Sequence, residues 1–248
     1  MTLSETDMPL FYRKPVPLNT EIHGAVTIGA SPQGYRFAVG SQTVLLAAVE
    51  FFDSCRQFPI VFVPSSNQRI LPVALLGLER NENLFVDDRG AWLGQYVPAY
   101  IRRYPFITSD GEDGQVRVCI DEAFDGLNRE GGAALFENGA PTVRMIEIQA
   151  FLQDYLLQMR KTEAFCASLV ESGLLGRIEA QANLADGRHY NLSGMLVVDE
   201  QRLTQLPDTD VVRLFRGGML GWIHAHLLSL RNLDRLPALK QVRRTVVR

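Results

Sequence analysis

The sequence predicts a single α+β protein in which strands dominate the N-terminal half, while a helix, a hairpin and a further helix form the C-terminal half. Three observations predict this class. Short apolar runs bounded by turn-forming residues recur before residue 80, residues 142–172 repeat apolar side chains at helical spacing, and an Asp-Gly pair at 186–187 joins two further apolar runs. At 248 residues without a Gly/Ser linker, the chain is expected to form one compact unit or two close lobes.

Four apolar runs in the first half are expected to form strands, namely residues 25–28, 35–39, 60–63 and 71–78. A helix is expected between the second and third runs. Ser41 is a suitable N-cap for it, and Pro59 prevents it from continuing past Phe58. Residues 92–103 predict a short helix that Pro98 restarts or kinks, and residues 116–120 predict another strand.

The second half begins with residues 124–140, which are rich in Gly and Asn and predict a loop or fragmentary helix that could act as an internal hinge. The longest helix is expected over residues 142–172, with Gly173 as its stop. Five further features follow: strands at 177–184 and 190–198, short helices beginning at Asp199 and at 207–208, and a basic segment at 240–248 expected to fray or to need a partner.

We therefore expect a flexible N-terminus at 1–10, one domain at 11–236 and a basic tail at 237–248. The composition, 46% hydrophobic and 21% charged, suits a soluble globular core. A formal net charge of -3 gives no general attraction to nucleic acid, so no such partner is expected. No apolar run reaches the ~20 residues that a membrane-spanning helix needs.

The cellular compartment is predicted from the N-terminus and the cysteines. The first residues place acids and prolines where a secretory signal needs a basic start and an apolar run. Cys55, Cys119 and Cys166 are few and odd in number, which is not the pattern of a disulfide framework. Both observations favour a cytoplasmic location.

The strongest candidate binding segment spans residues 81–106, which concentrate aromatic and guanidinium side chains. Such side chains dominate binding hot spots. The candidate partner-binding residues are Trp92, Tyr96, Tyr100, Arg102, Arg103 and Tyr104. The three tyrosines recur every four residues and would share one face of a helix. Binding to a partner and ordinary core packing remain equal alternatives for this segment.

Histidines are the candidate metal ligands, but their spacing argues against a shared ion. His224 and His226 are two residues apart, which places their side chains about 200° apart on a helix. We expect one buried and one surface imidazole, and neither a metal nor another cofactor. An alternative would join His23, His224 or His226 to a distant carboxylate in a metal-dependent oxygenase or an accessory to one.

Other chemically active residue types are expected to be structural. Cys119 has no base nearby in the sequence and is expected to be a buried cysteine. The acidic pairs 87–88 and 199–200 occur where turns and helix caps use carboxylates. No G-x-S-x-G motif is present, and the glycine pair 217–218 is expected to allow close helix packing or a helix break.

An ordered series of blocks resembles the bacterial SapC-like family over residues 11 to about 236. The blocks are FYRKPVPLNTEIHG, FPIVFVP, the 81–106 segment, CIDE, LVVDEQRL and FRGGMLGWIHAHLLSLRNL. The family is named for association with a bacterial surface layer, so the resemblance implies a protein partner or an envelope component, and cell-surface association. A peptide-transporter permease of the same name needs several apolar spans, which this chain lacks.

These observations predict a non-enzymatic binding or accessory protein of a surface-layer or envelope system. It would engage its partner through residues 92–104 and the terminal helix. The alternative is a small-molecule-binding enzyme, which should show a concave pocket where histidine and acidic side chains converge.

Overall fold

The computed structural model describes residues 9–65, 69–111, 115–183 and 189–246. It confirms the α+β class. A five-stranded antiparallel sheet has the order β11-β12-β4-β5-β3, and a second, three-stranded sheet has the order β1-β7-β6. The strands of the large sheet are β3 (Thr43–Leu45), β4 (Ile60–Pro64), β5 (Ile70–Leu75), β11 (Leu175–Asn183) and β12 (His189–Val198). Those of the small sheet are β1 (Pro15–Pro17), β6 (Phe106–Asp110) and β7 (Val116–Asp121).

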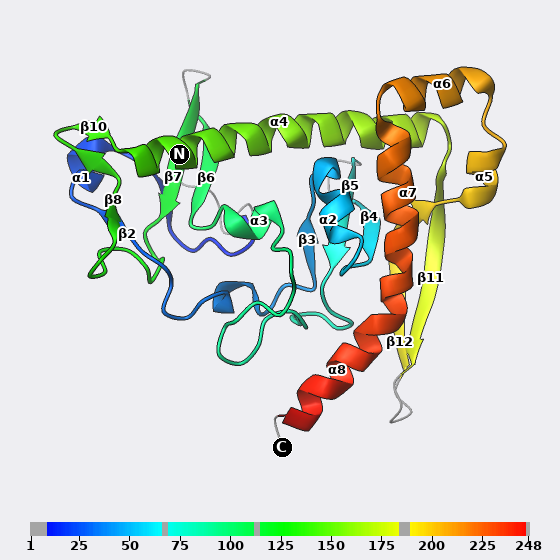
Figure 1. The fold of residues 1–248 in the computed structure, drawn as a ribbon, viewed down its shortest axis with the longest axis horizontal. Coiled ribbons are helices and arrows are strands. Elements are labelled where there is room, and N and C mark those ends of the chain that lie inside the picture. Colours follow the sequence, from blue (N-terminus) through cyan, green and yellow to red (C-terminus); the bar gives the residue numbers. More distant parts are fainter. Residues whose placement is uncertain (1–8, 66–68, 112–114, 184–188, 247–248) are drawn as a thin grey trace.

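Helix α4 (Val143–Glu171) runs along one side of the molecule and joins its two parts (Figure 1). Thr142 caps its first turn by accepting a hydrogen bond from the N–H of Met145, and Gly173 follows its last turn at φ 62°, where glycine carries no steric cost. The sequence thus predicted this helix and its stop at Gly173, while the structure assigns the N-cap to Thr142. At 29 residues it is roughly 43 Å long, which is enough to serve two separate cores.

Two hydrophobic clusters form these cores. The larger contains Phe51, Phe62 and Phe165 and lies between the five-stranded sheet and its helices. The smaller contains Ile28, Phe106, Ile120, Leu135, Met145, Ile148 and Leu152 and lies under the three-stranded sheet. The first half of α4 packs into the smaller cluster and its second half into the larger, so the helix fixes one cluster relative to the other.

The region before Phe58 differs from the prediction. Residues 35–39 contain a 3₁₀ helix, Arg36–Ala38, and no strand, and the expected helix from Ser41 is a strand followed by two single turns, Ala48–Glu50 and α2 (Phe51–Ser54). The reason is a long-range contact. Val44 pairs with Ala74 of β5, so the β-branched residues at 43–44 complete the edge of the large sheet.

Strands β4, β5 and β7 and the β11–β12 hairpin lie where they were predicted, while the turn at 185–188 lies outside the described residues. The expected helix at 92–103 is reduced to α3 (Ala99–Arg102), because Pro98 occupies its N-cap position. Residues 124–141 hold short paired strands. They are β8 (Ala133–Ala134), which pairs with β2 (Thr27–Ile28), and β9 (Phe136–Glu137), which pairs with β10 (Ala140–Pro141).

The C-terminal helices lie along the β11–β12 side of the large sheet (Figure 1). Asp199 caps α5 (Glu200–Thr204), and α6 (Asp208–Arg216) begins after Pro207, as predicted. Gly218, at φ 68°, separates α6 from α7 (Met219–Ser229), so the glycine pair is a helix break. A 3₁₀ turn, Leu230–Asp234, then leads into α8 (Arg235–Val246).

The basic segment expected to fray is helical as far as Val246. Its anchor is Lys240, whose side chain is 3% exposed and whose Nζ lies 3.0 Å from Glu79 Oε1 and 2.7 Å from Glu82 Oε1. Arg243 donates a 2.7 Å hydrogen bond to the carbonyl oxygen of Asn83. Charge complementarity with residues 79–83 therefore holds the tail, which a search for an apolar face could not reveal. No helix within the described ranges is long and apolar enough to cross a bilayer.

Candidate functional site

The segment 96–102 is held in place by the buried carboxylate of Glu50. Its Oε1 accepts hydrogen bonds from the hydroxyl of Tyr96 at 2.8 Å and the N–H of Ala99 at 2.7 Å, and its Oε2 accepts one from the N–H of Ala47 at 2.8 Å. Burial raises the pKa of Glu50, and these hydrogen bonds oppose the rise. The position of α3 therefore depends on one acidic side chain from the 3₁₀ turn Ala48–Glu50.

Three of the six candidate binding residues are packed within the protein. Trp92 donates a 2.8 Å hydrogen bond from Nε1 to the carbonyl oxygen of Tyr96, and its ring stacks on Phe85. Tyr96 is the partner of Glu50, and Tyr100 is only 6% exposed. Tyr96 lies before α3 and does not share a helical face with Tyr100. These three side chains support α3, and they do not form an exposed aromatic patch.

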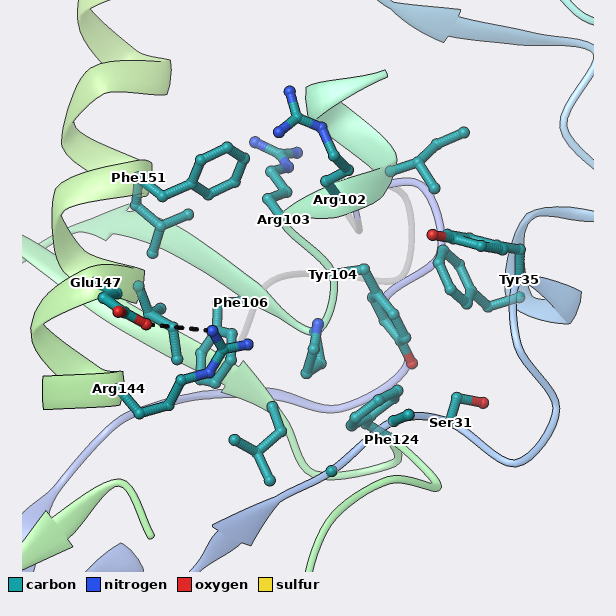
Figure 2. Close-up of a pocket in the computed structure, with 18 of the residues that line it drawn as sticks. Ser31, Tyr35, Arg102, Arg103, Tyr104, Phe106, Phe124, Arg144, Glu147 and Phe151 are labelled. Carbon is teal, nitrogen blue, oxygen red and sulfur yellow. Dashed lines mark hydrogen bonds and ion pairs between the residues drawn. The ribbon is translucent and has the colours of Figure 1, made fainter. Parts of the chain in front are cut away.

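The other three, Arg102, Arg103 and Tyr104, line a pocket of about 810 Å³ (Figure 2). Its walls come from residues 28–37, residues 101–106, Phe124 and the first half of α4. Ile101 belongs to the larger core, whereas Phe106 and Ile148 belong to the smaller one. The pocket therefore lies at the junction of the two cores, and its size is typical of sites for small molecules.

Arg103 is the most unusual side chain of this pocket. Its guanidinium carbon lies 3.9 Å from the ring centroid of Tyr100, 5.0 Å from that of Tyr155 and 6.0 Å from that of Tyr12. Its Nε is buried and has no hydrogen-bond acceptor. Among the described residues no carboxylate forms an ion pair with it. Aromatic faces stabilise the cation but leave this N–H group unsatisfied.

The two other arginines of the pocket have partners. Arg102 donates a 2.9 Å hydrogen bond from Nε to the carbonyl oxygen of Val97, and its guanidinium lies 5.3 Å from the ring centroid of Phe151. Arg144 pairs with Glu147 at 3.4 Å, one turn along α4. Figure 2 shows Arg102 and Arg103 near the Phe151 ring, and the Arg144–Glu147 pair further along the α4 side of the pocket. With three guanidinium groups and one carboxylate, the lining is net positive.

Tyr104 forms an aromatic wall of the pocket. Its hydroxyl donates a 3.2 Å hydrogen bond to Oδ2 of Asp121, which is fully buried and also accepts from the N–H groups of Arg13 and Lys14. Burial, followed by the charge of Asp121, raises the pKa of Tyr104, so its hydroxyl stays protonated at neutral pH. The ring lies 4.3 Å from Phe37, centroid to centroid, and is fixed as a neutral surface.

The histidines are not brought together. His226, on α7, is fully buried, while His224 is exposed, as the spacing predicted. The Nε2 of His226 accepts a 3.0 Å hydrogen bond from the N–H of Val198, so its Nδ1 carries the proton and donates to the carbonyl oxygen of Ile60 at 2.9 Å. The imidazole thus adds a link between β12 and β4. Among the described residues, these two strands are otherwise paired at a single position, Leu196 with Phe62. Burial lowers the pKa of His226 to about 4.

His23 lies at the end of α1 (Thr20–His23), on the side of the molecule away from α7 (Figure 1). Its Nε2 is 3.4 Å from Oε1 of Glu122, whose Oε2 pairs with Lys14 at 2.6 Å. The described part of the chain holds no group of three or more side chains placed to bind a metal ion. Of the three histidines proposed to join a distant carboxylate, His23 does so through Glu122, but this pair lacks a third ligand among the described residues.

The remaining candidates are structural, as expected. Cys119 is buried, with its Sγ 3.2 Å from the hydroxyl oxygen of Ser109. Asp87 accepts hydrogen bonds from the N–H groups of Arg89 and Ala91 in a turn, and Asp199 caps α5. These carboxylates stabilise local backbone and are separate from the pocket.

Comparison with known proteins identifies the family. A family model described as SapC matches residues 18–236. The chain belongs to the SapC family. The resemblance seen in the sequence blocks is thereby confirmed over nearly the whole chain. No curated protein and no solved structure matches this SapC family chain significantly.

Sequence reasoning found Arg102, Arg103 and Tyr104 of this SapC pocket but missed Arg144 and the residues that support Arg103 and α3. Glu50 was included in a predicted helix without a role, although an acid among apolar neighbours at 47–52 is a signal of a buried, hydrogen-bonded carboxylate. Tyr12, Tyr155 and Arg144 come from distant segments. No local pattern connects them with Arg103.

Proposed function

We propose that this SapC family protein is a non-enzymatic binding protein whose ligand site is the pocket between α3, α4 and residues 28–37. The observation that carries the proposal is Arg103, a guanidinium that the surrounding protein stacks but does not pair. Leaving a charged donor without an acceptor is costly, and an external ligand would supply the acceptor.

The composition of the pocket also favours binding over catalysis. Its lining is mostly apolar, and its one carboxylate, on Glu147, is paired with Arg144. Among the described residues that line it there is no histidine and no cysteine. A few polar groups on apolar walls are the usual composition of a binding site. The proposal needs no cofactor.

We further propose that the ligand belongs to an envelope or surface-layer system, either free or carried by a protein partner. The support is membership of the SapC family, which is named for such an association. The six residues selected from the sequence then have two roles. The ligand would contact Arg102, Arg103 and Tyr104. The segment that carries these three residues would be held in position by Trp92, Tyr96 and Tyr100.

Affinity capture of the full chain from its native cells, followed by identification of retained proteins and small molecules at moderate salt, tests this function. We expect a stoichiometric ligand that is retained by the wild type and by Arg216→Gln, an exposed control on α6, and lost from Arg103→Met. Equal retention of the same molecule by all three proteins would place binding elsewhere and contradict the proposal.

A further inference from the structure

We propose that the pocket binds a monovalent organic anion with an apolar body, whose carboxylate is held by Arg103. This inference rests on the proposed function and names the chemical class of its ligand. It combines two features of the pocket, a guanidinium that has no polar partner among the described residues and walls of aromatic and aliphatic side chains.

The guanidinium of Arg103 determines the head group. Its face is covered by Tyr100 and Tyr155, so the donors still available lie in its plane. A carboxylate presents two oxygen atoms in one plane and matches a guanidinium edge through two parallel hydrogen bonds. The buried Nε, which has no acceptor, would then gain one.

The partners that the three lining arginines already have distinguish a monoanion from a more highly charged ligand. Arg144 is neutralised by Glu147. Arg102 is exposed, and its Nε and Nη2 already donate to Val97 and Tyr96. Arg103 is thus the one lining arginine without a polar partner among the described residues. A phosphate dianion would need additional donors, and no lysine lines the pocket in the described part of the chain.

The walls determine the rest of the ligand. The apolar side chains that line the pocket together with Arg103 and the Arg144–Glu147 pair include Phe106, Phe124, Phe151, Ile148 and Leu152. Such walls offer apolar contact but few hydrogen-bond partners, so they favour an acyl or aromatic body over a sugar. Each methylene group that enters should tighten binding roughly fourfold until the space is filled.

Isothermal titration calorimetry tests this class with four defined probes, decanoate below its micelle concentration, decanol, acetate and inorganic phosphate. The wild-type chain should bind decanoate at least about tenfold more tightly than decanol, because only the acid can pair with Arg103. Acetate should bind far more weakly than decanoate, and phosphate should compete poorly.

Two variants and a control assign the effect to Arg103. Arg103→Met removes the charge at similar length, and Arg103→Lys keeps the charge but loses the planar edge. Decanoate affinity should fall at least about tenfold in the first and several-fold in the second. Arg216→Gln should bind like the wild type. Circular dichroism checks the fold, and if Arg103→Met does not fold, the lysine variant decides.

The outcomes separate this inference from the proposed function. If decanol binds the wild type as tightly as decanoate, with tyrosine fluorescence reporting occupancy of the pocket, the pocket binds ligands but the anion inference is wrong. Tight binding of phosphate with no preference for decanoate would also overturn it. If no probe binds and native capture yields neither a small molecule nor a protein partner that depends on Arg103, the proposed function fails as well.

Discussion

The guanidinium of Arg103 lies on the face of Tyr100, 3.9 Å from the ring centroid, while its buried Nε has no acceptor. The two residues occupy neighbouring turns of the short segment that Glu50 holds against the large sheet. This arrangement places the Arg103 cation at the wall of the pocket and leaves its Nε–H group without a hydrogen-bond acceptor. A feature of this kind is expected where a binding partner completes the site.

Arg103→Met should leave the ligand-free protein nearly as stable as the wild type, or more stable. The variant loses a cation–π contact but removes a poorly compensated charge, so its free energy of unfolding should differ by less than about 1 kcal/mol. Urea denaturation measures the difference. A loss several times larger would show that Arg103 is needed for folding and would weaken its assignment to ligand binding.

Glu50→Ala should destabilise the protein by at least about 3 kcal/mol, because the N–H groups of Ala47 and Ala99 and the hydroxyl of Tyr96 would lose their acceptor. Glu50→Gln keeps one acceptor oxygen and should cost less. Thermal unfolding measures both, with Glu137→Ala on an exposed strand as the control. If Glu50→Ala matched that control, the carboxylate would not be what positions α3.

His226 should make the protein sensitive to acid. Burial lowers its pKa to about 4 from 6.5, so the folded state binds fewer protons than the unfolded state. The stabilisation is therefore present above pH 6.5 and is lost as the pH falls toward 4, which amounts to about 3 kcal/mol for this shift.

Denaturation curves at pH 7 and pH 4 for the wild type, His226→Gln and His224→Gln isolate this contribution. The wild type and the exposed His224→Gln variant should lose stability in parallel. His226→Gln should lose about 3 kcal/mol less over the same interval. Parallel loss in all three proteins would contradict a buried neutral imidazole between Ile60 and Val198.

Lys240→Ala should release α8 from residues 79–83. The substitution leaves Glu79 and Glu82 without the ammonium group that lies between them, and we expect a loss of about 1–3 kcal/mol. Hydrogen exchange of the α8 amides should accelerate in this variant but not in Lys161→Ala, an exposed control on α4. Unchanged protection would mean that packing of Leu236 and its neighbours holds the helix alone.

The parts of this fold that sequence predicted are those with local causes. Helix α4 has a continuous apolar stripe, an N-cap at Thr142 and a stop at Gly173, and the β11–β12 hairpin has an Asp-Gly pair between its runs. Strand β3 was missed because its hydrogen bonds go to β5, about thirty residues later. Helix α8 was missed because its anchor is an ion pair with residues 79–82.

The candidate site was predicted only in part for the same reason. Residues 102–104 were selected by composition, and all three line the pocket. Their function as a site depends on walls from residues 28–37 and α4, which the chain brings to them through the junction of two cores. The separation of buried from exposed histidine at 226 and 224 was predictable, since it follows from helical geometry alone.

The most direct test of the central claim is to observe the Arg103 Nε–H resonance by NMR while decanoate is added. The resonance is assigned by its absence from Arg103→Lys. This donor has no acceptor in the ligand-free protein, so a hydrogen bond to the decanoate carboxylate should change its chemical shift strongly. The change should grow in proportion to occupancy, and decanol should not cause it. An Arg103 resonance that stays in place while decanoate saturates the protein would show that the anion binds elsewhere and would contradict the account.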